Sequence, residues 1–530
     1  MAETTQRVLI LDVETVDGES PVDVLVEGGR IAALAPAGVL EAEASAIEGR
    51  GRLVMPGFVD AHSHAAALLD DPGVQLAQLR QGITTVIAGQ DGVGPAPGDG
   101  RYAAEYFAAI DGRHRGSAGG GIGALLAAAD GTSPINVAAL VPAGTVRFEV
   151  MCRATRAPSA AELAAMVALV REGLAEGAVG LSTGLDYVPG LFASTDELTA
   201  LARPVAEAGG VFVSHMRGGY ESGSASGIAE LTAISRGSGA PIHVSHFHAE
   251  PHLVLGLLDR LEADGIDATF DAYPYGRGCS LLGMPLLPPE ISVLPVDAQL
   301  ARLTDSAERE RLLAEWFPTI VDYPSLGPDW PAMLTFAHIG APEYDWAHGK
   351  TVAEASVTAR RTPAEFALDV LVASRLEVNV VMAVRTERRD ADLARILAHP
   401  AAMGGSDGIF VGRHPHPRAR GTFARYLELL VRDGSLDWVR ATGLVSSRAV
   451  DRFALGDRGR VRPGAIADLV LVDPDRVGAR ATYDDPLATA VGIDDVLVGG
   501  IPVLAGGELT GEAPGRGIRR ASRPTERQEA

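Results

Sequence analysis

The sequence predicts an α/β protein in which eight parallel strands form a barrel and both chain ends form a small β-sandwich. From residue 56 onward, short apolar segments alternate with helical patterns, as is typical of parallel strands joined by helices. There are eight such segments, the strand number of closed parallel barrels. Both chain ends instead carry β-branched runs broken by Gly, Pro and Asp.

The β-sandwich is predicted from residues 1–55 and 460–510. The first region contains "RVLILDVETV" and "PVDVLVEGGRIAALAP", and the second contains "ADLVLVDPD" and "DVLVGGIPVLAGGELT". Both read as short strands separated by turn residues. We expect these two pieces to join into one domain, while residues 56–459 fold as a separate catalytic unit.

The barrel strands are predicted in residues 56–459. In chain order they are "LVMPGFVDAHSH", "ITTVIAG", "INVAALVPAG", "AVGLSTG", "GVFVSHMR", "PIHVSHFH", "ATFDAYPY" and "AAMGGSDG". Between several of them lie helical patterns such as "SAAELAAMVALVREGLAEG". Ser159 is predicted to cap this helix, with Glu162 completing a capping box.

Two segments depart from the alternation. Residues 277–399 are predicted to be a partly helical insertion over the barrel mouth, because "GMPLLPPEISVLP" and "EWFPTIVDYPSLGPDWPAM" are Pro-rich and irregular. Residues 511–530 are polar and are predicted to form a disordered tail.

Charge and composition exclude several classes of partner. The formal net charge of −22 argues against nucleic acid and anionic membranes, since both require a basic face. No run of about 18 uncharged apolar residues is present, and the N-terminal region is too polar for a signal peptide. The two cysteines cannot build a disulfide framework. We expect a cytoplasmic protein with no nucleic-acid or membrane partner, and the sequence leaves its oligomeric state open.

Residues able to bind a metal lie where the predicted strands end. In a parallel barrel these ends meet at one mouth. A single histidine there is often structural, but histidines ending three strands and aspartates ending two more favour a shared site. Imidazole and carboxylate donors suit zinc or a similar divalent ion. The residues are His62, His64, Asp91, His215, His246, His248 and Asp407.

The chemistry predicted for such a site is hydrolysis. A bound divalent ion lowers the pKa of its water to roughly 7, and Asp407 would move the proton from that water to the leaving group. Serine nucleophile chemistry is the weaker alternative. The pattern G-x-S-x-G occurs at residues 180–184 and 404–408, but neither is followed by the helix that a nucleophile elbow requires.

The motifs resemble the amidohydrolase superfamily, through "PGFVDAHSH" and the single Asp of the last barrel strand. Within it, the sequence is similar to the N-acyl-D-amino-acid deacylase (D-aminoacylase) family. The H-x-H pattern marks only the superfamily, whereas "YPY" and "RHPHPRARGTF" are specific to the smaller family. The matching motifs run in order from about residue 8 to residue 504 and include "GAVGLSTGLDYVPGLFASTDELTALA", "SHMR", "VSHFH", "FDAYPY", "GGSDG" and "DRGRVRPGAIADLVLVDP".

The resemblance implies a distorted (β/α)8 TIM-like barrel, a β-sandwich from both chain ends, and one or two Zn²⁺ ions or another divalent metal. Asp407 matches the general acid/base, and Tyr273 matches the residue that polarises the scissile carbonyl. Arg418 matches the arginine that binds the substrate carboxylate, a task suited to its planar fork of donors. The metal-site matches are His62, His64 and Asp407 for one ion, and His215 and His246 for the second.

The sequence departs from the family at several positions. Asp91, in "GQDG", replaces a cysteine ligand and is a harder donor. His248 stands where a lysine is usual, Cys279 where a small hydroxyl residue is usual, and residues 218–219 are glycines in place of an Asp-Glu pair. The only lysine, Lys350, lies away from any strand end, which excludes a carboxylated lysine between the metals. We expect Asp91 at the metal site and His248 and Cys279 on the substrate side.

The leading hypothesis is a metal-dependent amide hydrolase acting on a small molecule that carries an amide and a carboxylate. An N-acyl-D-amino acid, cleaved to a carboxylate and a free D-amino acid, is the expected substrate. The altered positions leave two alternatives open. One is a repurposed relative acting on another amide or cyclic C–N bond in specialised metabolism, and the other is a catalytically silent binding protein.

Overall fold

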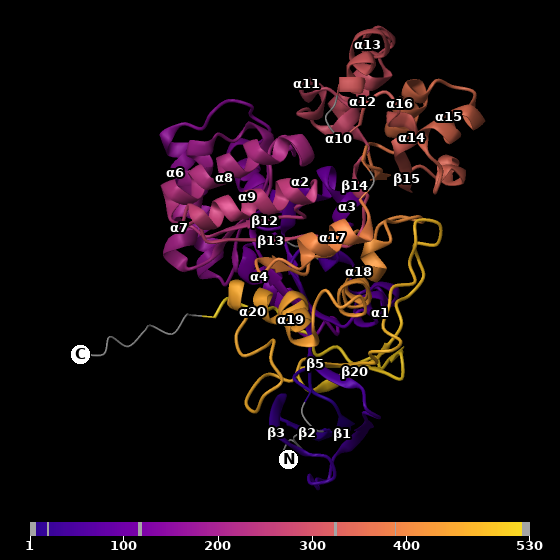
Figure 1. The fold of residues 1–530 in the computed structure, drawn as a ribbon. Coiled ribbons are helices and arrows are strands. Elements are labelled where there is room, and N and C mark those ends of the chain that lie inside the picture. Colours follow the sequence, from indigo (N-terminus) through magenta and orange to yellow (C-terminus); the bar gives the residue numbers. More distant parts are fainter. Residues whose placement is uncertain (1–6, 19–20, 115–118, 323–325, 387, 522–530) are drawn as a thin grey trace.

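The computed structural model describes residues 7–18, 21–114, 119–322, 326–386 and 388–521, and its centre is a barrel of parallel strands (Figure 1). Each barrel strand lies in one of the eight predicted segments, so the predicted (β/α)8 barrel is confirmed. The strands are β6 (Phe58–Asp60), β7 (Ile83–Ala88), β8 (Asn136–Ala139) continued by β9 (Val141–Pro142), β10 (Gly180–Gly184), β11 (Val211–His215), β12 (Ile242–Val244), β13 (Ala268–Asp271) and β17 (Ala402–Met403).

The barrel closes between its first and last strands. Its hydrogen bonds form two sheets, in the orders β6-β7-β8 and β17-β13-β12-β11-β10-β9. At the closing seam, the Ala61 amide donates to the Gly404 carbonyl at 2.9 Å. The Asp407 amide donates to the His62 carbonyl at 2.8 Å. These bonds hold the histidine-bearing loop after β6 beside the aspartate-bearing loop after β17.

Helices cover the outside of the barrel. Helix α6 begins at the predicted capping box, in which the Ser159 hydroxyl accepts from the Glu162 amide at 3.3 Å and the Glu162 carboxylate accepts from the Ser159 amide at 2.7 Å. Among the described residues, none of the helices combines the length and apolar character needed to cross a membrane. The helices around the barrel are α1 (Pro72–Leu79), α2 (Arg101–Tyr106), α3 (Ala108–Asp111), α4 (Ile122–Ala129), α5 (Ala143–Met151), α6 (Ala160–Ala175), α7 (Thr195–Ala208), α8 (Ser224–Ser238), α9 (Pro251–Ala263), α17 (Asp390–Leu397), α18 (Arg418–Tyr426), α19 (Trp438–Thr442) and α20 (Arg448–Arg452).

The two chain ends form a β-sandwich, at the bottom of Figure 1. One sheet has the order β3-β2-β1-β4, and the other has the order β21-β20-β19-β18-β5. Buried apolar residues of both sheets, such as Ile10 and Leu469, share one core. The strands are β1 (Arg7–Val13), β2 (Val22–Glu27), β3 (Arg30–Pro36), β4 (Ser45–Glu48), β5 (Leu53–Pro56), β18 (Leu469–Val472), β19 (Ile493–Val498), β20 (Ile501–Ala505) and β21 (Glu508–Leu509).

The insertion forms a separate lobe, at the top right of Figure 1. It is built on an antiparallel sheet of order β14-β16-β15 and has its own hydrophobic core, which includes Phe336 and Phe366. Its elements are β14 (Gly278–Leu281), α10 (Gly283–Leu286), α11 (Pro289–Ser292), α12 (Val296–Thr304), α13 (Ser306–Arg311), α14 (Trp330–Met333), β15 (Leu334–Ile339), α15 (Val352–Ala359), α16 (Pro363–Ala373) and β16 (Val378–Met382).

The insertion ends earlier than the predicted residue 399. Helix α17 (Asp390–Leu397) packs against α9 in the outer layer of the barrel. Its buried residues Leu393 and Leu397 belong to the barrel's main core, not to the core of the lobe. The amphipathic pattern of this helix is therefore that of a barrel helix, and the lobe ends with β16.

The prediction of a disordered tail is wrong for residues 511–521. The Ile518 amide donates to the Val137 carbonyl at 2.7 Å, and the Arg516 amide donates to the Asn136 side chain at 3.0 Å. Ile518 is buried against the barrel. A short backbone match to β8 therefore orders a segment whose composition is polar. The rest of the predicted tail, residues 522–530, lies outside the described residues.

Candidate metal centre

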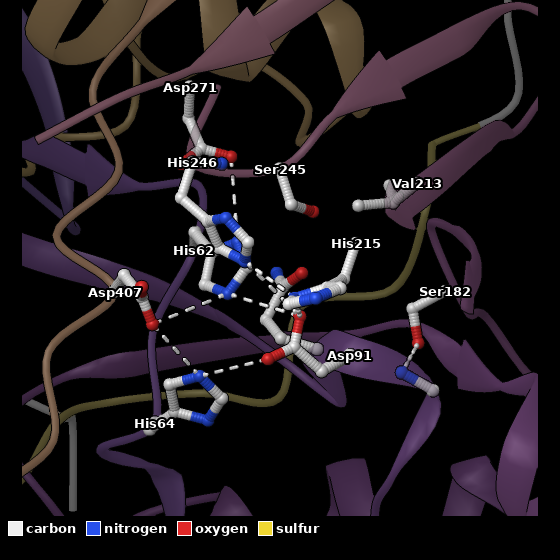
Figure 2. Close-up of polar contacts among 12 residues, drawn as sticks. His62, His64, Asp91, Ser182, Val213, His215, Ser245, His246, Asp271 and Asp407 are labelled. Atoms are coloured by element: carbon white, nitrogen blue, oxygen red, sulfur yellow. Dashed lines mark hydrogen bonds and ion pairs between the residues drawn. The ribbon is translucent and has the colours of Figure 1, made fainter. Parts of the chain in front are cut away.

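The predicted metal-binding residues meet at one mouth of the barrel (Figure 2). Parallel pairing of β10, β11 and β12, and of β6, β7 and β8, brings the C-terminal ends of these strands to the same side. Every one of the residues is at least nine-tenths buried. They are His62 and His64 after β6, Asp91 after β7, His215 at the end of β11, His246 after β12 and Asp407 after β17.

These side chains form two donor sets that share Asp91. His62, His64 and Asp91 form one set, and Asp91, His215 and His246 form the other. Within each set the donor atoms lie within 4.8 Å of one another. The Asp91 carboxylate lies 3.8 Å from His62 Nε2 and 3.6 Å from His246 Nε2 through the same oxygen, Oδ1. Asp91 therefore lies between the two sets.

The chemistry of these donors fits a divalent cation. His62 Nε2 and Asp91 Oδ1 are buried and have no hydrogen-bond partner among the described residues. Leaving buried polar atoms unpaired is costly, and a cation placed between them would satisfy both. A donor set of imidazoles and carboxylates is the one that zinc prefers.

Asp407 connects the metal-binding residues to Arg418. Its Oδ1 lies 3.2 Å from His64 Nε2, and its Oδ2 lies 2.9 Å from Arg418 Nη2. Burial alone would raise the pKa of Asp407, but the Arg418 guanidinium and the nearby imidazoles hold it well below its usual value. A carboxylate that stays ionised can accept a proton during a reaction.

Three of the site residues have strained backbones. Asp91, His246 and Asp407 have φ angles of 55°, 34° and 48°, in the left-handed region that non-glycine residues rarely adopt. Strain of this kind concentrates at functional sites, where the surrounding structure holds it in place. The turn after each strand thus aims a side chain at the shared centre.

Three carboxylates outside the donor sets orient the histidine rings; Asp271 is buried, and Asp111 and Asp186 are partly buried. Asp111 Oδ1 lies 2.6 Å from His64 Nδ1, and Asp271 Oδ2 lies 3.5 Å from His62 Nδ1. Asp186 Oδ2 lies 3.4 Å from His215 Nε2. A carboxylate on one ring nitrogen leaves the other nitrogen to face the centre.

The sequence prediction missed these three carboxylates. Asp271 and Asp186 had a usable signal, because each follows or ends a predicted barrel strand. Asp111 had none, since it lies in the short helix α3 and reaches His64 across the mouth.

The predicted substrate-side residues line the same mouth. The Arg418 guanidinium lies 4.4 Å from the centre of the Tyr273 ring. The centre of the His248 ring lies 4.3 Å from the centre of the Tyr273 ring, and the two rings are tilted by 41°. Both ring nitrogens of His248 are buried without a hydrogen-bond partner among the described residues. Burial lowers the pKa of His248 to about 3, with His246 and Arg418 adding to the effect. Cys279 lies on β14, next to the glycine that approaches the Tyr273 hydroxyl.

His416 holds Arg418 in place. Its Nδ1 accepts from the Arg418 amide at 3.0 Å, and its Nε2 donates to the Arg277 carbonyl at 3.0 Å. Arg277 follows "YPY", so this imidazole ties the loop carrying Arg418 to the loop carrying Tyr273.

The serines of the two G-x-S-x-G patterns are engaged in structural hydrogen bonds. Ser182 bonds the Gly89 carbonyl and accepts from the Gly92 amide, and Figure 2 shows it apart from the imidazoles. Ser406 donates to Asp60 Oδ2 at 2.5 Å. The Ser406 hydroxyl also reaches the His62 backbone carbonyl at 3.5 Å. Within the described part of the chain, neither hydroxyl bonds a histidine ring, as a serine nucleophile would need to do.

Comparison with known proteins identifies the family of this chain. Residues 46–503 match the model of the "Amidohydrolase family". The chain is 32% identical to the N-acyl-D-glutamate deacylase of Alcaligenes xylosoxydans xylosoxydans over 94% of this chain and 92% of that protein. It is 30% identical to the D-aminoacylase of the same organism over 94% of each chain.

A solved structure of a deacylase has the same fold as this chain. The N-acyl-D-glutamate deacylase from Bordetella bronchiseptica, complexed with zinc and a phosphonate mimic of the tetrahedral intermediate, superposes with a TM-score of 0.78. The two chains are 29% identical, and the match covers 98% of this chain and all of that one. The family model spans most of the sequence and the fold agrees throughout, so this chain belongs to the amidohydrolase family.

Proposed function

We propose that the protein is a zinc-dependent deacylase of N-acyl-D-amino acids. The observation that carries the proposal is Asp407, which faces His64 with one oxygen and Arg418 with the other. A single carboxylate thus lies between the metal donors and a buried guanidinium suited to a substrate carboxylate. The deacylase names of the relatives support the same reaction.

The metal ligands in this proposal come from both donor sets. His62, His64, Asp91 and Asp407 would hold one Zn²⁺, and Asp91, His215 and His246 would hold a second. When bound, such an ion lowers the pKa of water toward neutrality and polarises an amide carbonyl. The deacylase from Bordetella bronchiseptica is complexed with zinc, which supports zinc as the ion in this proposal.

Asp407 is the proposed proton carrier. It accepts a proton from the attacking water as the new C–O bond forms at the acyl carbon. It then delivers that proton to the amide nitrogen as the C–N bond breaks, which releases a carboxylate and a free amine. Its position within 3.2 Å of His64 keeps it beside the donors throughout.

Tyr273 and Arg418 are the proposed substrate-binding groups. Burial raises the pKa of the Tyr273 hydroxyl, which therefore stays protonated and can donate a hydrogen bond to the carbonyl oxygen. Arg418 uses Nη2 for Asp407, while its Nε and Nη1 have no hydrogen-bond partner among the described residues. Those free donors are available to a substrate carboxylate.

His248 favours a second candidate substrate class. A lysine at this position would add a positive charge, whereas an imidazole with a pKa of about 3 is neutral. His248 and Cys279 therefore line a substrate pocket with less positive charge than the family pattern provides. A repurposed hydrolase of another amide or a cyclic C–N bond is the corresponding alternative. A cytoplasmic location remains a prediction from the sequence.

A substrate panel tests the proposal. Purified protein supplied with Zn²⁺ is assayed on N-acetyl-D-amino acids, their L enantiomers and a set of cyclic amides, with Asp407→Asn as the inactive control. Turnover of D forms that is absent in the control is expected. Turnover of cyclic amides alone would establish the second candidate. A protein that binds no zinc and turns over nothing would be a silent binding protein.

A further inference from the structure

The carboxylate of Asp186 lies on the outer side of His215, and two glycine amides hold it there. We propose that Asp186 is a positioning residue for His215 and that the Gly218–Gly219 turn holds Asp186 in its working orientation. This inference rests on the proposed metal centre, because it concerns how one of its ligands is aimed. In this proposal Asp186 acts only through His215 and does not itself bind substrate or metal.

Asp186 determines which nitrogen of His215 faces the centre. Its Oδ2 lies 3.4 Å from His215 Nε2, and a carboxylate can only accept there, so Nε2 carries the proton. The opposite nitrogen, Nδ1, is then left with its lone pair. It lies 3.2 Å from His246 Nε2 and 3.8 Å from Asp91 Oδ1, among the other donors of the second set. Carboxylate partners of this kind commonly orient metal-binding histidines.

The glycine pair supplies two hydrogen bonds to the same carboxylate. The Gly218 amide donates to Asp186 Oδ1 at 2.8 Å, and the Gly219 amide donates to Oδ2 at 2.9 Å. Both oxygens of Asp186 are therefore occupied. This arrangement fixes the plane of the carboxylate and keeps it an acceptor toward His215.

Backbone conformation is what requires glycine at these two positions. Gly218 and Gly219 have φ angles of 76° and 69°, in the left-handed region that only glycine adopts without strain. Space is not the limit. An added Cβ at Gly218 would meet nothing within 4 Å, and one at Gly219 would lie 4.0 Å from Asp186 Oδ2. An acidic side chain at Gly219 would also place a like charge near Asp186.

The turn is anchored on both sides. Arg217 pairs with Glu230 at 3.1 Å and donates to the carbonyls of Leu191 and Ala193, both at 2.6 Å. On the other side, the Tyr220 hydroxyl donates to the Ser245 carbonyl at 2.8 Å. The two amides are thus held in position before any ligand binds.

Zinc affinity is the direct test. The full-length protein is stripped of metal and titrated with Zn²⁺ against a chelating dye, using wild type, Asp186→Ala, Asp186→Asn and His215→Ala. Loss of an outer carboxylate partner typically weakens metal binding by about 10- to 100-fold. Asp186→Ala should therefore lower the affinity for one of the two ions by this factor. Asp186→Asn should fall between Asp186→Ala and wild type, because its carbonyl can still accept from Nε2. The visible spectrum of bound Co²⁺ should also change in Asp186→Ala, since it reports the ligand geometry.

A matched pair of glycine variants separates positioning from backbone strain. Gly209 ends α7 with φ 69° and open space around it, so Gly209→Ala imposes the same strain away from the site. Both Gly219→Ala and Gly209→Ala should lower the thermal unfolding midpoint. Only Gly219→Ala should weaken Zn²⁺ binding. The loss should be about a few-fold, because the carboxylate partner of His215 is displaced but not removed.

The outcomes distinguish this inference from the proposed function. Wild-type affinity and an unchanged Co²⁺ spectrum in Asp186→Ala would overturn the inference and leave the metal centre in place. Equal zinc loss in Gly219→Ala and Gly209→Ala would overturn the role of the glycine turn. If His215→Ala binds Zn²⁺ as wild type does, or wild type binds none, the proposed second donor set itself is wrong.

Discussion

Arg418 Nη2 lies 2.9 Å from Asp407 Oδ2, and both side chains are buried at the barrel mouth. The pair joins the residue proposed to move the proton to the residue proposed to hold the substrate. A carboxylate bound by Arg418 would therefore sit beside the proton carrier, which places the amide of an N-acyl amino acid near the metal donors.

Replacing Asp407 by Asn should abolish turnover. The amide can neither accept nor deliver the proton, and loss of general acid–base catalysis typically costs about 10²- to 10⁴-fold in rate. Steady-state kinetics on an N-acetyl-D-amino acid measures the loss, and circular dichroism checks the fold. Asp433→Asn, at an exposed position, is the control and should keep full activity. A kcat for Asp407→Asn within a few-fold of wild type would remove Asp407 from the mechanism.

Arg418→Ala should mainly raise KM for carboxylate substrates. Removing one member of a buried charge contact commonly weakens binding by roughly 10²-fold or more. Arg418→Lys should recover part of this loss, because it keeps the charge but not the fork of donors. The measurement is KM for an N-acetyl-D-amino acid and for its carboxamide, which lacks the negative charge. An equal increase for both compounds would show that Arg418 does not recognise the carboxylate.

Asp91 should be replaceable by cysteine but not by alanine. Its carboxylate lies within 3.8 Å of nitrogens from both donor sets, and a thiolate is also a zinc ligand. Asp91→Cys should keep zinc bound. Asp91→Ala should lower the zinc affinity by more than the 10- to 100-fold typical of losing an outer carboxylate partner. Zinc content after dialysis against a weak chelator measures this. Equal zinc content in Asp91→Ala and wild type would exclude Asp91 as a ligand.

The barrel and most of its site could be predicted because both follow from local pattern. Each barrel strand is a short apolar run, and a residue such as His215 or Asp407 comes directly at or after its end. Parallel strands then place these ends together without any further information. Because the strands share one parallel direction, the site residues can be grouped without knowledge of long-range contacts.

The features that could not be predicted depend on contacts between distant segments. Asp111 reaches His64 from a short helix 47 residues later, and nothing in its neighbourhood distinguishes it from a surface acid. The tail around Ile518 looks polar, and only its backbone match to β8 orders it. Gly218 and Gly219 could be noticed as a change of residue type, but their hydrogen bonds to Asp186 appear only in three dimensions.

The two cysteines should differ strongly in reactivity. Cys152 is exposed, whereas burial raises the pKa of the Cys279 thiol to about 12. Only the thiolate reacts with iodoacetamide, and a raised pKa keeps Cys279 protonated until the pH approaches that value. At pH 8 its thiolate population is roughly two-thousandfold below that of a free cysteine of pKa about 8.5. Mass spectrometry should therefore find Cys152 labelled first, with Cys279 labelling rising about tenfold for each pH unit. Cys152→Ser isolates the slow site. Rapid labelling of Cys279 at pH 8 in that variant would show that this thiol is open to solvent and does not line a closed substrate pocket.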